Sequence, residues 1–168
     1  MLSKIITPPT QVIDLDRARL QCKITGSDRD ADVIDAVAGA RDYAESFLGV
    51  PVGDQVREYM YPTWSGSVVL PCDVSELQAI TARGVSVTPL TGLLADRTLT
   101  LPLTTAVPVV VRIRCGYSAD TLPGTVKSAM LLLIADLVRN PQAQSEVQLY
   151  RNHAFDALLW PHRERLPL

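Results

Sequence analysis

Apolar and polar residues follow two different periods along the chain. Apolar positions recur at helical spacing up to about residue 48 and again after residue 122, whereas they alternate with polar positions over residues 55–115. The pattern predicts an α+β fold, with a helical base of about four helices and an antiparallel β insertion between the second and third helices. We expect a single domain over residues 1–168, in which residues 1–54 and 116–168 form the helical base and residues 55–115 the insertion.

Helix boundaries are predicted from capping residues. Asp14 is expected to cap the first helix, and residues 27–30 have the S-x-x-D form of a capping box before the second. Gly49 stands where the second helix should end. Pro123 is placed to open the third helix, and an S-x-x-Q box at residues 145–148 marks the last. The predicted helices are residues 14–22, 28–48, 123–139 and 145–160.

The apolar stripes of these helices predict the core of the base. The third helix is apolar almost all round, so we expect it to be the central helix. The residues expected to be buried are Ile34, Val37, Phe47, Met130, Leu133, Ile134, Leu137 and Leu158.

The alternating segment predicts short antiparallel strands, after an extended lead-in at Thr7-Pro8-Pro9. In the longest strand the odd-numbered residues from 109 to 115 share one face and the even-numbered residues share the other. We therefore expect one buried face and one partly solvated face. The predicted strands are residues 56–61, 67–70, 77–82, 85–87, 98–101 and 107–115.

The formal net charge of −2 argues against a protein whose whole surface binds nucleic acid, because neutralising phosphates needs an excess of Lys and Arg. A local basic face remains open. Arg57, Arg112 and Arg114 are expected on one face of the sheet, where they either touch DNA or pair with acidic side chains. The acidic net charge favours pairing, inside the insertion or with a neighbouring subunit. The candidate acidic partners in the insertion are Glu58, Asp73 and Asp96.

The patterns that could bind a metal are incomplete. Asp28, Asp30 and Asp32 resemble the start of a calcium loop, but Val33 stands where that loop needs Gly, and Gly39 stands where it needs Glu. Capping and dipole stabilisation of the second helix explain these aspartates better. The two histidines and three cysteines lack zinc-site spacing. We expect no metal and no cofactor.

The sequence contains no phosphate-binding loop and no nucleophile elbow. Cys115 lies at a strand end, but the sequence nominates no base to activate it, so we interpret it as a buried thiol. The start of the chain lacks the apolar stretch of a signal peptide, and the apolar run over residues 129–135 is too short to span a membrane. We expect a cytoplasmic protein that does not enter a membrane.

Several short motifs, taken in order along nearly the whole chain, resemble one known family. They are Thr7-Pro8-Pro9, Asp28-Arg29-Asp30-Ala31-Asp32, Ala40-Arg41-Asp42-Tyr43-Ala44-Glu45, Gln55, Leu70-Pro71, Arg114-Cys115-Gly116-Tyr117, Leu122-Pro123, Lys127-Ser128-Ala129-Met130-Leu131-Leu132-Leu133-Ile134-Ala135-Asp136 and Ala157-Leu158-Leu159-Trp160-Pro161-His162-Arg163. The sequence resembles the phage head–tail connector proteins, also called neck adaptor or head-completion proteins, in the longer branch that carries a β insertion.

This resemblance implies a structural subunit that is not an enzyme, forms a ring between portal and tail, and contributes to head completion and DNA passage. The implied partners are the portal protein, neighbouring copies of the chain, and other neck or tail-completion proteins. Double-stranded DNA would pass through the lumen without sequence recognition. The implied location is the neck of the virion, after assembly in the host cytoplasm.

The C-terminal segment is the candidate contact with the portal or with a neighbour, because Trp and Arg are common anchors of interfaces. Pro161 is expected to stop the last helix and let the tail leave the body. The alternative is that Trp160 packs onto the helical base. The candidate contact residues are Leu158, Trp160, Pro161, His162, Arg163 and Arg165.

Two other function classes remain open. One is a small cytoplasmic module that binds a partner protein through the β segment. The other is an enzyme centred on Cys115 or on the aspartates. A closed ring would separate the connector from the module, which would act as a monomer.

Overall fold

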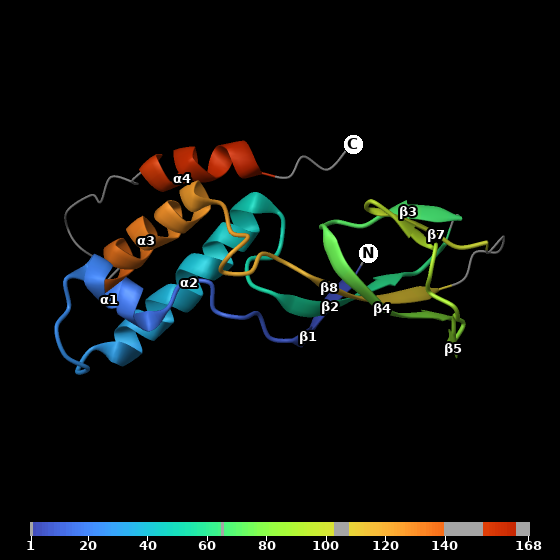
Figure 1. Cartoon of the computed structure of the whole chain (residues 1–168), viewed down its shortest axis with the longest axis horizontal. Helices are drawn as coiled ribbons and strands as arrows, with labels where there is room; N and C mark the ends of the chain where they lie inside the picture. The colour runs from blue at the N-terminus through green and yellow to red at the C-terminus, as the bar shows by residue number, and fades with distance from the viewer. Residues whose placement is uncertain (1, 65, 103–107, 140–152, 164–168) are drawn as a thin grey trace. The chain divides into compact units, whose positions relative to one another are not determined.

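The computed structural model describes residues 2–64, 66–102, 108–139 and 153–163. It confirms the α+β fold, with helices before and after a group of antiparallel strands, β2 to β8, that follows α2 and precedes α3 (Figure 1). The chain divides into two compact units. The sheet unit comprises Met1–Thr10 and Gly53–Ser118, and the helical unit comprises Gln11–Val52 and Ala119–Leu168. No helix in the described ranges combines the length and the apolar character needed to cross a membrane.

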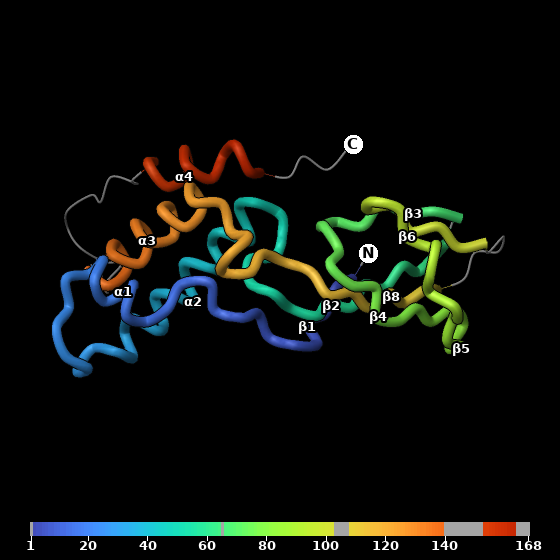
Figure 2. The backbone as a smooth tube through the Cα atoms, viewed as in Figure 1, coloured from blue at the N-terminus to red at the C-terminus, as the bar shows by residue number. Residues whose placement is uncertain are grey.

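The helical unit contains four helices within the described residues, and α3 contacts each of the other three (Figure 2). The first three begin and end within about two residues of their predicted limits. The predicted start of the last helix, at residue 145, lies outside the described residues. The helices are α1 Leu15–Cys22, α2 Asp30–Leu48, α3 Gly124–Arg139 and α4 His153–Leu159, and a 3₁₀ turn, η1, follows at Trp160–His162.

The predicted cap of α1 and the predicted end of α2 are both confirmed. The Asp14 carboxylate accepts a hydrogen bond of 2.7 Å from the backbone N–H of Arg17. Gly49 adopts a φ of 78°, and its N–H donates to the carbonyl of Glu45 at 2.9 Å. A positive φ at this position favours glycine, because glycine has no Cβ to clash with the backbone.

The capping box predicted at the start of α2 is wrong. The residue before the helix is Arg29, and no side chain caps the first turn. The Asp30 carboxylate instead pairs with the guanidinium of Arg19 on α1, whose Nε donates to it at 2.8 Å. A charge-assisted contact with a second helix has replaced the local cap, which a sequence pattern cannot anticipate.

The predicted core of the helical unit is partly wrong. Val37, Met130 and Ile134 are buried as expected, but Ile34 and Leu137 are 44% and 40% exposed. Phe47, Leu133 and Leu158 are only half-buried. The buried stripe of α3 is Val126, Ala129, Met130, Leu131, Ile134, Ala135 and Val138.

The physical reason lies in the number of neighbours around α3. Because α1, α2 and α4 all contact this helix, the side of α3 that is buried depends on where these three helices lie, and it includes the small residues Ala129 and Ala135 beside larger ones. An all-round apolar sequence leaves the direction of that surface undetermined.

The sheet unit is built on a five-stranded antiparallel sheet in the order β1-β2-β8-β4-β5. The strands are β1 Leu2–Thr7, β2 Gln55–Tyr61, β8 Val109–Cys115, β4 Val74–Ala82 and β5 Val85–Ser86. A second sheet has the order β3-β7-β6, with β3 Ser67–Val69, β7 Thr98–Thr100 and β6 Leu94–Ala95.

Strands β1 and β6 were not predicted. Residues 2–7, which the sequence pattern placed with the helical base, pair with β2, with Leu2 opposite Met60 and Lys4 opposite Glu58. All six residues of β1 are exposed, so they carry no buried alternation that would mark a strand. The pairing joins segments about fifty residues apart, and it becomes visible only in the folded chain.

The central strand β8 has the two faces that its alternation predicts. Val109, Val111, Ile113 and Cys115 are all buried in the core of the sheet unit. Arg112 and Arg114, on the opposite face, are exposed. The buried face packs with side chains from neighbouring strands, including Tyr59 and Ile80.

The corrected stripe of α3 generates a test by paired substitutions. Ile134→Ala removes a fully buried side chain and should lower the free energy of unfolding by about 2–5 kcal/mol, from lost burial and a residual cavity. Leu137→Ala, three residues along the same helix, should cost about 1 kcal/mol or less because the side chain is already partly in water. Denaturant unfolding of both variants measures the difference, and equal losses would contradict the stripe.

Candidate interaction surfaces

The solvated face of the sheet carries charges that alternate from strand to strand. Residues that pair across antiparallel strands share a face. Lys4 on β1 lies opposite Glu58 on β2, and Glu58 lies opposite Arg112 on β8. The Nη2 of Arg112 is 3.0 Å from the Oε2 of Glu58, so Arg112 pairs with an acidic residue of the insertion.

Arg57 does not share this face, and the expectation that Arg57, Arg112 and Arg114 lie together is wrong. Arg57 pairs in register with Ile113, on the buried side of the sheet. Its Nε donates to the Oε1 of the buried Gln55 at 2.9 Å. The register between two strands decides which residues meet on a face, and a shift of one residue reverses the answer.

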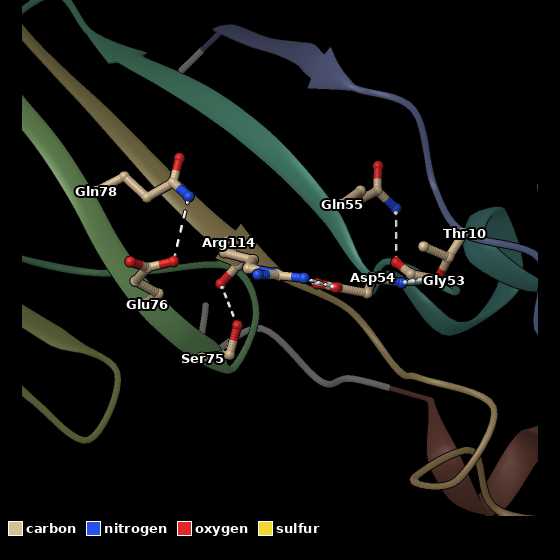
Figure 3. A network of polar contacts seen from close by, with 8 residues as sticks. All are labelled: Thr10, Gly53, Asp54, Gln55, Ser75, Glu76, Gln78 and Arg114. Carbon is tan, nitrogen blue, oxygen red and sulfur yellow. Dashed lines mark hydrogen bonds and ion pairs between the residues drawn. The ribbon is translucent and has the colours of Figure 1, made fainter.

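Arg114 forms the second ion pair of this face, with Asp54, a residue that the sequence pattern did not nominate. Its Nε lies 2.9 and 3.0 Å from the two carboxylate oxygens of Asp54, as Figure 3 shows. The hydrogen bonds from Arg114 hold the pKa of Asp54 below its usual value, and Asp54 in turn raises the pKa of Arg114. Both arginines of the solvated face are therefore engaged within the chain.

The backbone around Asp54 is fixed by a close approach between two segments. The N–H of Asp54 donates to the Oγ1 of Thr10 at 3.0 Å, and the N–H of Thr10 donates to the carbonyl of Asp54 at 3.0 Å (Figure 3). The preceding residue, Gly53, has a φ of 99°, and a Cβ at this position would lie 2.5 Å from the carbonyl oxygen of Thr10. Only glycine fits, so the segment before β2 is held against the segment after β1.

On the helical unit, the half-buried Phe47 and the exposed Trp160 and Arg163 form a cluster, here called the aromatic–arginine patch. The rings of Phe47 and Trp160 have centroids 6.3 Å apart at an angle of 64°. The Cζ of Arg163 lies 5.7 Å from the centroid of Phe47 and 5.6 Å from that of Trp160, within the range of a cation–π interaction. Trp160 is nevertheless 57% exposed, so the patch presents a large apolar ring to solvent.

The chain does not leave the helical unit at Pro161, and that expectation is wrong for residues 161–163. Pro161 stands in the first turn of the 3₁₀ segment, where its missing N–H costs no hydrogen bond. The Nε2 of His162 is hydrogen-bonded to the Oγ1 of Thr125 on α3 at 2.6 Å. The N–H of Arg163 donates to the carbonyl of Trp160 at 3.3 Å. Among the other candidate contacts, Leu158 is half-buried and Pro161 is exposed, while Arg165 lies outside the described residues.

The position of the patch depends on a polar link between α2 and α4. The Oη of Tyr43 donates to the Oδ1 of Asp156 at 2.6 Å, and the ring of Tyr43 meets that of Phe155 edge to face at 5.3 Å. These residues lie more than a hundred positions apart in sequence, and no motif joins them. The sequence pattern therefore missed the contact that orients α4.

Cys115, the candidate nucleophile, lies in the core of the sheet unit. Cys115 is fully buried, which confirms its interpretation as a buried thiol, and Cys72 beside it is also buried. The Oη of Tyr59 lies 3.7 Å from the Sγ of Cys72. A hydrogen bond with Cys115 lowers the pKa of Cys72, but a thiolate there would be out of reach of any substrate.

The acidic residues near the start of α2 are occupied by arginines. Asp30 binds Arg19, and Asp32 binds Arg29 at 3.0 Å. Within the ranges that the structure describes, no three His, Cys, Asp or Glu side chains come together as a metal site would require.

The comparisons with known proteins point to the same family as the motifs. No protein-family model matches the chain. A segment of 45 residues is 47% identical to the head completion protein gp6 of Enterobacteria phage HK97, covering 27% of this chain and 42% of the phage protein. The chain thus spans less than half the length of that relative. Over the matched segment the chain is similar to the head completion protein, so the resemblance is confirmed.

Solved neck structures share the fold over the whole chain. A chain from the neck of an empty gene transfer agent (GTA) particle, computed with C6 symmetry, superposes with a TM-score of 0.80 and 17% identity. The match covers 100% of this chain and 98% of that one. A chain from the neck of the native GTA particle, computed with C12 symmetry, gives a TM-score of 0.71 and 16% identity. At these identities the likeness establishes the fold.

The buried tyrosines of the sheet unit predict how its stability depends on pH. Burial raises the pKa of Tyr61 to about 12 and raises the pKa of Tyr59 further. Stability from a phenol with a raised folded pKa is complete below the unfolded value of about 10 and is lost as pH rises through the folded value. The free energy of unfolding should therefore fall between about pH 10 and 12.

Denaturant unfolding across this pH range, followed together with the ultraviolet absorbance of phenolate, measures the effect. The double variant Tyr59→Phe, Tyr61→Phe should show a flatter pH dependence. Ionisation of every tyrosine of the native protein near pH 10 would contradict the burial of these two side chains.

Proposed function

We propose that this chain is a structural head-completion subunit of a phage or phage-like particle. In this proposal, copies of the chain form a ring in the neck between portal and tail, after assembly in the host cytoplasm. The subunit acts as a connector and carries out no catalysis. Its partners are neighbouring copies, the portal protein and other neck or tail-completion proteins.

The observation that carries the proposal is the fold match with a neck subunit, which covers 100% of this chain and 98% of the neck subunit. An insertion, a missing layer or an added domain would lower one of those two fractions. The sheet unit and the helical unit therefore both have counterparts in one neck protein. The 45-residue homology to a head completion protein adds a sequence link of the same kind.

Ring formation suits the arrangement of surfaces on this chain. A closed ring uses heterologous contacts, in which two different faces of each subunit meet. Exposed apolar side chains occur on both units, among them Leu2 and Ile5 on the sheet unit and Trp160 on the helical unit. Apolar exposure of this kind is expected of a subunit whose surface becomes covered on assembly.

The charge balance fits a DNA conduit better than a DNA-binding protein. The net charge is −2, and Arg112 and Arg114 on the solvated sheet face are already paired with carboxylates. Unpaired arginines would bind phosphates and retard passage. A mixed or acidic lumen lets double-stranded DNA slide without sequence recognition.

The aromatic–arginine patch is our candidate for the portal contact. Trp160 and Arg163 belong to the residue types that dominate binding energy at interfaces. The patch is pre-formed, because Phe47 and the hydrogen bond between His162 and Thr125 hold it in place. A pre-formed patch loses less conformational entropy on binding than a free tail would.

The ring itself is tested by electron microscopy and mass photometry of the purified protein, alone and mixed with the portal protein encoded in the same genome. The expected result is a closed oligomer in one or both samples. A protein that stays monomeric in both samples would overturn the proposal and would favour a binding module.

The portal contact is tested separately by substitution. Trp160→Ala should weaken portal binding by on the order of 2 kcal/mol while leaving thermal stability nearly unchanged. Leu20→Ala, an exposed apolar residue on α1, is the matched control and should change neither. If Trp160→Ala leaves binding intact, the portal contact lies elsewhere on the chain.

A further inference from the structure

One edge of the five-stranded sheet is formed by β1. Within the described residues this strand pairs with β2 alone, and all six of its residues are exposed. Leu2 and Ile5 are 63% and 49% exposed. The outer side of β1 therefore carries backbone N–H and C=O groups that another strand could pair with.

The opposite edge is formed by the first part of β4. The short strand β5 pairs with Thr81 and Ala82, and the N–H of Val87 donates to the carbonyl of Ile80. Residues 74–79 extend beyond that pairing, and Ser75, Glu76 and Gln78 are exposed. The second edge is thus about as long as β1.

The strand directions at these two edges are compatible. Three antiparallel steps lead from β1 to β4, so the two edge strands run in opposite directions. In a head-to-tail arrangement, a neighbouring copy can lie beside the sheet with its strands in the same orientation as those of the first copy. The β1 strand of that neighbour then runs antiparallel to β4 of the first copy. The extended sheet would keep the antiparallel pattern throughout.

The charges on the two edges are complementary and lie on the same face. Lys4 shares the solvated face with Glu58 and Arg112, and Glu76 pairs in register with Arg114 on that face. Lys4 begins the row Lys4, Glu58, Arg112 at one edge, and Glu76 ends the neighbouring row, beside Arg114, at the other edge. Placing Lys4 of one copy opposite Glu76 of the next brings these opposite charges together, between the register shifts that β4 has at Val74–Glu76 and Leu77–Ala79 and away from the shift that β1 has at Ile5–Thr7.

We propose that neighbouring copies of this chain join edge to edge, with β1 of one copy paired to residues 74–79 of β4 in the next copy. The inference rests on the proposed ring and assigns its subunit contact. The backbone pairing supplies much of the affinity, and Lys4 facing Glu76 sets the register. A two-fold pairing of β1 with β1 would stop at a dimer and leave the β4 edge open.

Charge reversal tests the contact in the full-length protein. Lys4→Glu and Glu76→Lys each place like charges at the junction and should weaken ring formation about tenfold or more. The double variant Lys4→Glu, Glu76→Lys restores opposite charges and should recover assembly. Lys127→Glu and Asp28→Lys, which reverse charges on the helical unit, are the matched controls and should assemble normally. Circular dichroism and thermal melting establish that each variant is folded.

Cysteine cross-linking tests the geometry directly. In a Cys22→Ser background, which removes the one half-exposed thiol among the described residues, Lys4→Cys with Glu76→Cys should give a ladder of covalent oligomers on oxidation. Lys4→Cys alone should give no cross-link. An efficient covalent dimer from Lys4→Cys alone would overturn the proposal in favour of the two-fold pairing.

The outcomes separate this inference from the function on which it rests. If the wild-type protein forms rings but the charge reversals leave them unchanged and the cysteine pair forms no ladder, the edge contact is wrong and the connector function stands. If the wild-type protein forms no closed oligomer, alone or with the portal protein, both fail.

Discussion

The antiparallel pairing of β8 with β2 on one side and β4 on the other determines the properties of the sheet unit. This register buries Val109, Val111, Ile113 and Cys115 together and turns Arg112 and Arg114 to solvent. A shift of one residue would bury both guanidinium groups and expose the apolar face, at a cost that the small unit could not offset. The register also sets which charges line up across the strands, and therefore where Lys4 and Glu76 lie at the two edges.

The helical unit depends in the same way on one buried element, the helix α3. Its contacts with α1, α2 and α4 bring together segments from both ends of the described chain. The C-terminal turn can then lie against α3 through the hydrogen bond between His162 and Thr125, and against α2 through the ring of Phe47. The aromatic–arginine patch is a consequence of this packing.

In the proposed connector, the edges of the sheet and the aromatic–arginine patch would serve different partners. The sheet edges are complementary to each other and so suit contacts between copies, whereas the aromatic–arginine patch carries the kinds of side chain that anchor a different protein. Arg112 and Arg114 on the solvated sheet face are paired with Glu58 and Asp54 within the chain, which suits the proposed passage of DNA without binding. A subunit with these features can assemble and dock without chemistry of its own.

The sequence by itself determined the elements and their order, since helical and alternating spacing are local properties. The Asp14 cap, the Gly49 terminus and the two faces of β8 could all be predicted, and the order of short motifs indicated the family. The sequence could not determine which side of α3 is buried, that residues 2–7 form a strand, or that Arg57 lies on the other face of the sheet from Arg112 and Arg114. It also could not foresee that Asp30 would bind Arg19 instead of capping α2. Each of these depends on contacts between residues far apart in the chain, where packing and register override the local pattern, and only the tertiary structure decided them.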